Sequence, residues 1–175
     1  TNPSMEKTEL DPIYDIARKH QILTIIDNTF LTPYLSRPLT EGADIVLHSA
    51  TKYIGGHNDV LAGVVTVKDQ DLAEQLFIYH NMVGATMSPF DSFLLLRGLK
   101  TLHVRMDRAI ENAKKVAEYF QGHQGIKEVL YAGTTGMLSL RFAEDYSVHK
   151  FLEEIEVCTF AESLGGTETF ITFPF

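Results

Sequence analysis

An open α/β fold with a mostly parallel sheet is predicted by the order and character of the segments along the chain. Two apolar, β-branched runs, at 22–26 and 43–48, lack polar alternation, which is typical of strands buried on both faces. A helical pattern at 11–21 precedes the first run. A third strand is expected at 60–67, and an amphipathic helix follows it at 69–79. Helices that alternate with buried strands in this way are the pattern of an α/β domain.

The character of the sequence changes after residue 88. One long helical stretch is expected from 88 to about 121, with an interruption at Gly98. Beyond it the pattern is α+β, with one helix at about 147–156 and short strands at 129–131, 137–142 and 169–173. We therefore expect two domains, residues 1–104 and residues 105–175, with the long helix linking them.

Composition narrows the classes of function. The 175 residues carry 15 Lys and Arg against 23 Asp and Glu, a formal net charge of −8, which disfavours nucleic acid as a partner. No apolar run reaches the roughly 18–20 residues that a membrane span needs. Cys158 is the single cysteine, so a disulfide framework and a thiolate metal cluster are excluded within the chain. We expect no metal site, no membrane partner and a cytoplasmic location, since no basic and apolar secretory signal is visible.

Polar residues follow the first two predicted strands at the point where ligands bind in open α/β sheets. Asp27 ends the first strand, and Ser49, Thr51 and Lys52 end the second. Such residues can supply a carboxylate, two hydroxyls and an amine, which are the groups that pyridoxal phosphate requires. Each alone is ordinary, because a strand-end aspartate is usually a turn cap and a lone lysine is usually solvated. A nucleotide site is poorly supported, since no Gly-x-Gly-x-x-Gly follows a strand and Lys52 precedes Gly55 and Gly56.

The combination resembles a known family. Asp27-Asn28-Thr29-Phe30 followed by the run His48–His57 is similar to the cystathionine/methionine-metabolism family of pyridoxal-phosphate enzymes. Lys52 lies 25 positions after Asp27, as expected for that family. Thr1-Asn2-Pro3, Arg97–Leu102 and Glu162–Gly166 also match family elements. The resemblance runs nearly end to end. It implies a fold-type-I pyridoxal-phosphate transferase, with a large domain and a smaller α+β domain that are both incomplete in this chain.

The resemblance also implies roles for individual residues. Lys52 would bind pyridoxal phosphate covalently and move protons during the reaction, and Asp27 would hold the pyridine nitrogen protonated. Further cofactor contacts would come from Ser49 and Thr51 at the phosphate, Asn2 at the phenolic oxygen and Thr29 against a ring face. The substrate would be positioned by Ser163 and Leu164, with Glu162 facing its distal end.

Other residues near these motifs have simpler interpretations. We expect His48 and His57 to be structural hydrogen-bond donors and Tyr53 to serve packing. Cys158 is interpreted as a core residue. The segment Tyr131–Met137 is shorter than the family pattern, and upstream and downstream family elements have no counterpart here. Two explanations are open. The sequence either joins ordered residues across disordered segments, with a break near Gly133–Gly136, or belongs to a truncated protein that has lost function.

The expected function is carbon–sulfur chemistry on a sulfur amino acid. Cystathionine lyase activity, by β- or γ-elimination, is the first hypothesis. The alternative is γ-replacement on an O-acylhomoserine by a cystathionine γ-synthase, and a further alternative is a non-catalytic remnant of the fold. A homo-oligomer, as a dimer of dimers, is expected from the resemblance, and Met87 and Phe90 could face a partner chain or the core.

Overall fold

The structure is a computed structural model that describes residues 1–173. It contains two compact units, one of Glu9–Leu102 and one of His103–Phe175 together with Thr1–Thr8. The division falls near the expected boundary at 104/105, but the grouping of the first eight residues with the second unit was not predicted. The assignment of the two domains as a cofactor domain and a smaller domain stays a prediction. No helix in the described part of the chain is long and apolar enough to cross a membrane.

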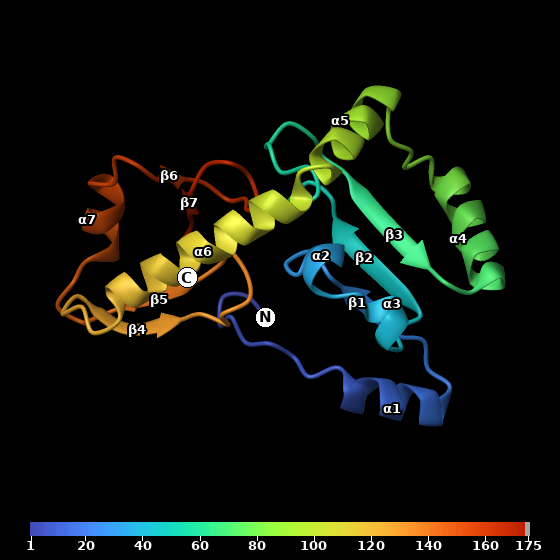
Figure 1. The fold of residues 1–175 in the computed structure, drawn as a ribbon, viewed down its shortest axis with the longest axis horizontal. Coiled ribbons are helices and arrows are strands. Elements are labelled where there is room, and N and C mark those ends of the chain that lie inside the picture. Colours follow the sequence, from blue (N-terminus) through green and yellow to red (C-terminus); the bar gives the residue numbers. More distant parts are fainter. Residues whose placement is uncertain (174–175) are drawn as a thin grey trace. The chain divides into compact units, whose positions relative to one another are not determined.

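The first unit is built on a three-stranded sheet with the order β1-β2-β3, comprising β1 (Ile25–Asp27), β2 (Ile45–Ser49) and β3 (Gly63–Val67). Figure 1 shows the three strands side by side, with β2 in the centre. β1 and β2 are parallel, in agreement with the predicted sheet. β3 runs antiparallel to β2, because its connection from Ser49 to Gly63 has no crossover helix of the kind that a parallel return needs.

Burial differs from the expectation for the first apolar run. Ile45 and Val46 of β2 are buried, as predicted for a central strand. Ile22, Leu23 and Ile25, in contrast, are more than half exposed. Because β1 is a three-residue edge strand with one neighbour in this sheet, its apolar residues are not covered on both sides. The prediction that residues 22–26 are buried on both faces is therefore wrong for this chain.

The helices of the first unit begin and end at recognisable signals. The Asp69 carboxylate accepts the Leu72 N–H at the start of α4, and Gly84 ends that helix in the left-handed conformation. The Ser88 hydroxyl accepts the Asp91 N–H at the start of α5. The helices are α1 (Asp11–His20), α2 (Thr32–Leu35), α3 (Pro38–Glu41), α4 (Gln70–Val83) and α5 (Pro89–Leu99). The short helices α2 and α3 lie between β1 and β2, and each has a proline at a position that the first helical turn tolerates.

The second unit contains α6 (Leu102–Phe120), except for its first residue, and the short elements that follow it in the chain. The expected long helix is divided between α5 and α6 at Lys100–Thr101, so Gly98 lies within α5 and does not interrupt it. The remaining elements are β4 (Ile126–Leu130), β5 (Ser139–Phe142), α7 (Val148–Glu153), β6 (Thr159–Phe160) and β7 (Phe170–Ile171). β4 and β5 pair antiparallel, and β6 and β7 pair parallel. Cys158 precedes β6 and is only half-buried, so its interpretation as a core residue is wrong.

Two apolar clusters stabilise the first unit. Ala50, Ile54, Val60 and Leu95 form one of them, which lies beneath the segment that follows β2. Tyr14, Ala43 and Val46 form the other, between α1 and the sheet. Each Å² of apolar surface that these clusters remove from water stabilises the folded state by roughly 25 cal/mol. The first cluster therefore anchors the residues on either side of Lys52, although Lys52 itself is not part of it.

Candidate active site

The carboxyl ends of β1 and β2 lie next to each other, because the two strands are parallel and in register. Asp27 pairs with Leu47, and the Asn28 N–H donates to the Leu47 carbonyl at 2.9 Å. Ser49, the last residue of β2, lies two residues farther along the neighbouring strand. The structure thus brings the predicted carboxylate and the first predicted hydroxyl to the same edge of the sheet. Ligands of open α/β folds bind at this edge.

Thr29 links these two strand ends. Its hydroxyl donates to Oδ1 of Asp27 at 2.6 Å and accepts the Ser49 N–H at 2.8 Å. The Thr29 N–H also donates to the same carboxylate oxygen, at 3.0 Å. The side chain is 9% exposed. The Thr29 hydroxyl is thus bonded to Asp27 and to the Ser49 backbone, and the contact of Thr29 with a cofactor ring stays a prediction.

Lys52 lies in a tight turn that follows β2. The Lys52 N–H donates to the Ser49 carbonyl at 3.1 Å, and the Lys52 carbonyl accepts the Gly56 N–H at 2.8 Å. A further bond joins the Gly55 N–H to the Ala50 carbonyl at 2.8 Å. Ala50 is fully buried, and the side chain of Lys52 is half-buried. The turn therefore holds the lysine backbone within three residues of the strand end that carries Ser49.

Helix α5 packs directly on the backbone of this turn. A Cβ atom at Gly98 would lie 2.3 Å from the Gly55 carbonyl oxygen and 2.5 Å from the Ile54 carbonyl oxygen. Real Cβ atoms do not approach a carbonyl this closely, so only glycine permits the contact. Gly55 is similarly confined, since its Cβ would lie 2.7 Å from a methyl carbon of Val60. These two glycines fix the position of the turn that carries Lys52.

The two predicted phosphate ligands differ in their surroundings. The Thr51 hydroxyl donates to the Ala62 carbonyl at 3.2 Å and accepts the Ala62 N–H at 3.0 Å. It therefore ties the turn to the segment that leads into β3. The Ser49 hydroxyl forms no hydrogen bond to any residue that the structure describes. Ser49 is thus the hydroxyl that a phosphate oxygen can use without breaking an existing contact.

His48 and Asn28 form a buried polar pair next to the predicted site. The Asn28 amide nitrogen donates to the Ser36 carbonyl at 3.0 Å and lies 3.3 Å from Nε2 of His48. Because an amide nitrogen only donates, Nε2 is the acceptor and His48 is neutral with its proton on Nδ1. Burial lowers the pKa of His48, and the Asp27 carboxylate opposes this effect. The pair holds the segment after β1 in place, which agrees with a structural role for His48.

The remaining neighbours are structural as well. Nδ1 of His57 lies 2.9 Å from the Gly55 carbonyl, to which it donates, as expected for a histidine that orders the turn. Tyr53 is buried, in agreement with its expected packing role. Asn2, Glu162, Ser163 and Leu164 belong to the second unit, so the site residues placed together are those of the first unit alone. The assignments of these four residues stay predictions.

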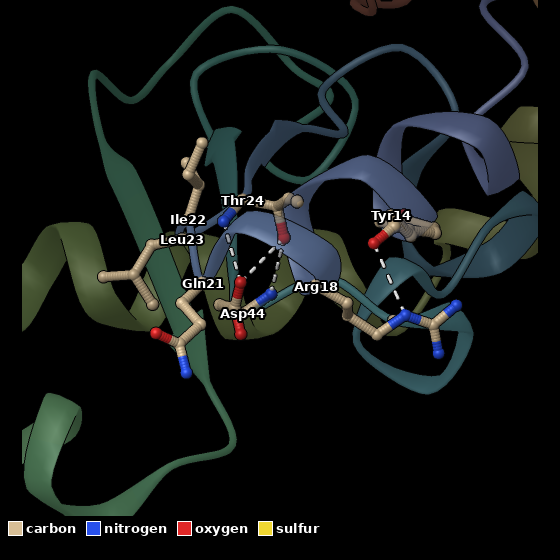
Figure 2. Close-up of a pocket in the computed structure, with 9 residues that line it drawn as sticks. Tyr14, Arg18, Gln21, Ile22, Leu23, Thr24 and Asp44 are labelled. Carbon is tan, nitrogen blue, oxygen red and sulfur yellow. Dashed lines mark hydrogen bonds between the residues drawn. The ribbon is translucent and has the colours of Figure 1, made fainter.

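A separate pocket lies at the opposite ends of the same strands, before β1 and β2. Figure 2 shows the side chains that line it, with Thr24 and Asp44 joined by hydrogen bonds. The Asp44 carboxylate accepts both the Thr24 N–H, at 2.7 Å, and the Thr24 hydroxyl, at 2.9 Å. The Asp44 N–H donates to that hydroxyl at 3.1 Å. This threonine bridge was not predicted from the sequence, where its one signal is the equal spacing of 20 positions in Thr24–Asp44 and Thr29–Ser49.

Residues 1–175 match the family described as Cys/Met metabolism PLP-dependent enzyme. The chain belongs to this family. The predicted family and its cofactor, pyridoxal phosphate, are thereby confirmed. The match covers both compact units, so the site at the ends of β1 and β2 lies within the matched residues.

The relatives include enzymes with different reactions. A cystathionine gamma-synthase/O-acetylhomoserine (thiol)-lyase of Bacillus subtilis is 51% identical over 174 residues, which cover 99% of this chain and 47% of that protein. A cystathionine beta-lyase of Lactococcus lactis is 42% identical over 190 residues, which cover 99% of this chain and 50% of that protein. The chain thus spans about half the length of the curated relatives it matches.

A solved structure shows the same fold. The cystathionine gamma-lyase of Lactobacillus plantarum, complexed with L-serine, has a TM-score of 0.94 and 37% identity, and it covers 98% of this chain and 49% of its own. The predicted α/β fold of pyridoxal-phosphate transferases is therefore confirmed. The alignment with the Bacillus gamma-synthase has 174 positions for 99% of 175 residues, which leaves no room for a longer segment at Tyr131–Met137. The longer segment of the family pattern is therefore absent from this relative too, and the break near Gly133–Gly136 stays a prediction.

The chemistry of the strand-end residues fits pyridoxal phosphate. Asp27 retains its second oxygen, Oδ2, which accepts no hydrogen bond from the described residues. Ser49 retains a hydroxyl, and Lys52 supplies an amine three residues away along the chain. These are the groups needed for a protonated ring nitrogen, a phosphate and an aldehyde carbon, respectively. Asp27, Ser49 and Lys52 are thus the residues that would hold the cofactor.

Proposed function

We propose that the complete protein catalyses pyridoxal-phosphate-dependent carbon–sulfur chemistry on a sulfur amino acid, with cleavage of cystathionine as its reaction. The observation that carries this proposal is the convergence of Asp27 and Ser49 at adjacent strand ends, with the Lys52 turn directly after them. Family membership and the names of the relatives support the same chemistry. When bound, pyridoxal phosphate supplies an electron sink that stabilises negative charge at the Cα atom of an amino acid.

The residues of this chain have distinct proposed roles. The Lys52 amine would anchor the cofactor, be displaced by the substrate amine, and then accept the Cα proton as a general base. The Asp27 carboxylate would keep the ring nitrogen protonated through Oδ2, and the Ser49 hydroxyl would donate to the phosphate. Asn2, Thr51, Ser163, Leu164 and Glu162 keep the cofactor and substrate roles that the resemblance implies, as proposals.

A second candidate is γ-replacement, in which a thiol displaces the acyl group of an O-acylhomoserine. Two relatives at 51% identity carry the name cystathionine gamma-synthase. The alignment with the first of them is also about 16 positions shorter than the alignments with the lyases, as the 174 and 190 aligned residues show. The same lysine and carboxylate serve both reactions, so the site at β1 and β2 does not separate them.

Product analysis of the purified full-length protein separates these reactions. With cystathionine and water, β-elimination gives pyruvate, ammonia and homocysteine, whereas γ-elimination gives 2-oxobutyrate, ammonia and cysteine. With O-acetylhomoserine and cysteine, γ-replacement gives cystathionine. Release of either oxo acid supports the first candidate, and cystathionine formation without oxo acid supports the second. A protein that gives none of these products, with either substrate and with pyridoxal phosphate present, would contradict the proposal.

We also propose a cytoplasmic homo-oligomer. α4 and α5 expose a set of large apolar side chains that this chain leaves uncovered: Phe77, Met82, Val83, Phe90 and Leu96. Phe90 is 67% exposed, so the alternative that it belongs to the core is wrong for this chain. An apolar surface of this kind marks a contact with further protein, and the oligomer implied by the family resemblance makes a second copy the proposed partner. Sedimentation of the full-length protein tests the proposed oligomer, and a monomer at micromolar concentration would contradict that oligomer.

A further inference from the structure

The strand ends at the proposed cofactor site are joined by the side chain of Thr29. The Thr29 hydroxyl accepts the Ser49 N–H, so its own hydrogen is free to donate, and it donates to Oδ1 of Asp27 at 2.6 Å. An O–H···O⁻ bond of this length is in the range of charge-assisted hydrogen bonds. Thr29 thus contacts both the carboxylate proposed for the ring nitrogen and the backbone of the proposed phosphate ligand.

Two hydrogen bonds converge on the same carboxylate oxygen. Oδ1 of Asp27 accepts from both the N–H and the hydroxyl of Thr29, which fixes the rotation of the carboxylate about its side-chain bonds. Oδ2 is left as the oxygen available to a ligand in the described part of the chain. A carboxylate held in one orientation loses less side-chain freedom on binding than a freely rotating one.

We infer that Thr29 is a positioning residue of the proposed site, whose hydroxyl orients the Asp27 carboxylate and couples it to the Ser49 backbone. The inference rests on the proposed function. It adds Thr29 as the residue that orients Asp27, the proposed partner of the ring nitrogen. Because Thr29 is 9% exposed, little of its surface is available for direct contact with a ligand. Its effect on the cofactor is therefore exerted through Asp27.

The chain contains a matched control for this role. The Thr24 hydroxyl bridges the segments before β1 and β2, where it donates to Oδ2 of Asp44 and accepts the Asp44 N–H (Figure 2). Thr24 is also 9% exposed, and its bridge likewise spans 20 residues. The two threonines therefore make the same kind of link between the same two strands. Only the Thr29 link lies at the ends that carry Asp27 and Ser49.

The experiment compares Thr29→Val, Thr29→Ala, Thr29→Ser and Thr24→Val in the full-length protein. Two readouts are taken besides activity: the dissociation constant of pyridoxal phosphate for the apoprotein, and the pH midpoint of the visible absorption of the bound cofactor. Loss of a hydrogen bond to a charged group is expected to weaken cofactor binding about tenfold or more in the two variants without a hydroxyl. The absorption midpoint should move in both variants, because it follows protonation of the C=N bond between the cofactor and Lys52, which responds to the charge held at the ring nitrogen.

Thr29→Ser should restore both readouts to near wild type, and Thr24→Val should leave both unchanged even though it removes an equivalent bridge. The inference is overturned if Thr29→Val and Thr29→Ala match Thr24→Val in both readouts. It is also overturned if Thr29→Ser is as defective as the other two, because then the methyl group is responsible. A wild-type protein that binds pyridoxal phosphate while Thr29→Val behaves normally refutes this inference alone. A wild-type protein that binds none refutes the proposed function as well.

Discussion

The side-chain amide of Asn28 bridges the carbonyl of Ser36 and the imidazole of His48, 3.3 Å away, across two parallel strands. This contact requires a neutral His48, since Nε2 must accept a hydrogen bond. The pair lies beside the strand ends that carry Asp27 and Ser49, so its protonation state bears on the stability of the proposed site.

The first expectation concerns pH. Burial lowers the pKa of His48 below its ordinary value of 6.5, so the folded state binds its proton more weakly than the unfolded state. Neutral His48 therefore contributes stability that is fully present above about pH 6.5 and is lost as the pH falls toward the lowered pKa. His48→Gln keeps an acceptor but cannot titrate, so its unfolding free energy should fall less steeply below pH 6.5. His20→Gln, at the exposed end of α1, is the control, and equal slopes for wild type and His48→Gln would contradict the expectation.

The second expectation concerns the contact between α5 and the Lys52 turn. Gly98→Ala places a Cβ against the Gly55 carbonyl at 2.3 Å, so the helix or the turn has to shift. Overpacking of this kind costs roughly 1–3 kcal/mol, which exceeds the gain of about 1 kcal/mol from replacing a helical glycine. We expect lower stability and weaker cofactor binding. Gly63→Ala is the control, since its Cβ would meet no atom within 4 Å; a Gly98→Ala protein as stable as this control would contradict the packing described.

A third expectation separates the two hydroxyls of the phosphate region. Thr51→Val removes both side-chain hydrogen bonds to Ala62 and should cost about 1–2 kcal/mol of unfolding free energy. Ser49→Ala breaks no hydrogen bond among the described residues, so stability should change by less than about 0.5 kcal/mol. Its effect should instead be an approximately tenfold weaker affinity for pyridoxal phosphate. Denaturant unfolding and cofactor titration measure the two effects, and a Ser49→Ala protein with normal cofactor affinity would remove Ser49 from the site.

The fourth expectation concerns Tyr14, whose hydroxyl is buried and has no hydrogen-bond partner among the described residues. Burial, followed by the carboxylates of Glu41 and Asp11, raises its pKa. An unpaired buried hydroxyl costs roughly 1–3 kcal/mol, so Tyr14→Phe should leave the unfolding free energy unchanged or raise it by about 1 kcal/mol. Tyr14→Ala should lose about 3–5 kcal/mol through the cavity that it creates. A Tyr14→Phe protein that is destabilised by more than about 1 kcal/mol would contradict an unpaired hydroxyl at Tyr14.

The sequence predicted the strand ends well because local patterns define them. An apolar β-branched run that stops at Asp27, and another that stops at His48-Ser49, are visible without any knowledge of pairing. The antiparallel direction of β3 was not predicted, since strand direction depends on the path of a connection that has no periodicity. The exposure of Ile25 was not predicted either, because burial depends on which segments cover the sheet.

The candidate site was only partly predictable for a similar reason. Lys52 and Asp27 are chemically distinctive, so spacing and family resemblance identify them. The commitment of the Thr29 hydroxyl to Asp27, and of the Thr51 hydroxyl to Ala62, depends on side-chain geometry across two strands. A hydroxyl that binds a ligand and one that binds the backbone look the same in a sequence. The close approach of Gly98 to Gly55 is likewise a contact between segments 43 residues apart in the chain.

The most direct test of the central claim is chemical labelling of the lysine in the full-length protein. The protein is incubated with pyridoxal phosphate, reduced with borohydride, digested and analysed by mass spectrometry, with Lys52→Ala as the control. A phosphopyridoxyl group on the peptide that contains Lys52, together with loss of the visible absorption band, is the expected result. A colourless protein, or a label on other lysines that Lys52→Ala leaves unchanged, would contradict the assignment of the site.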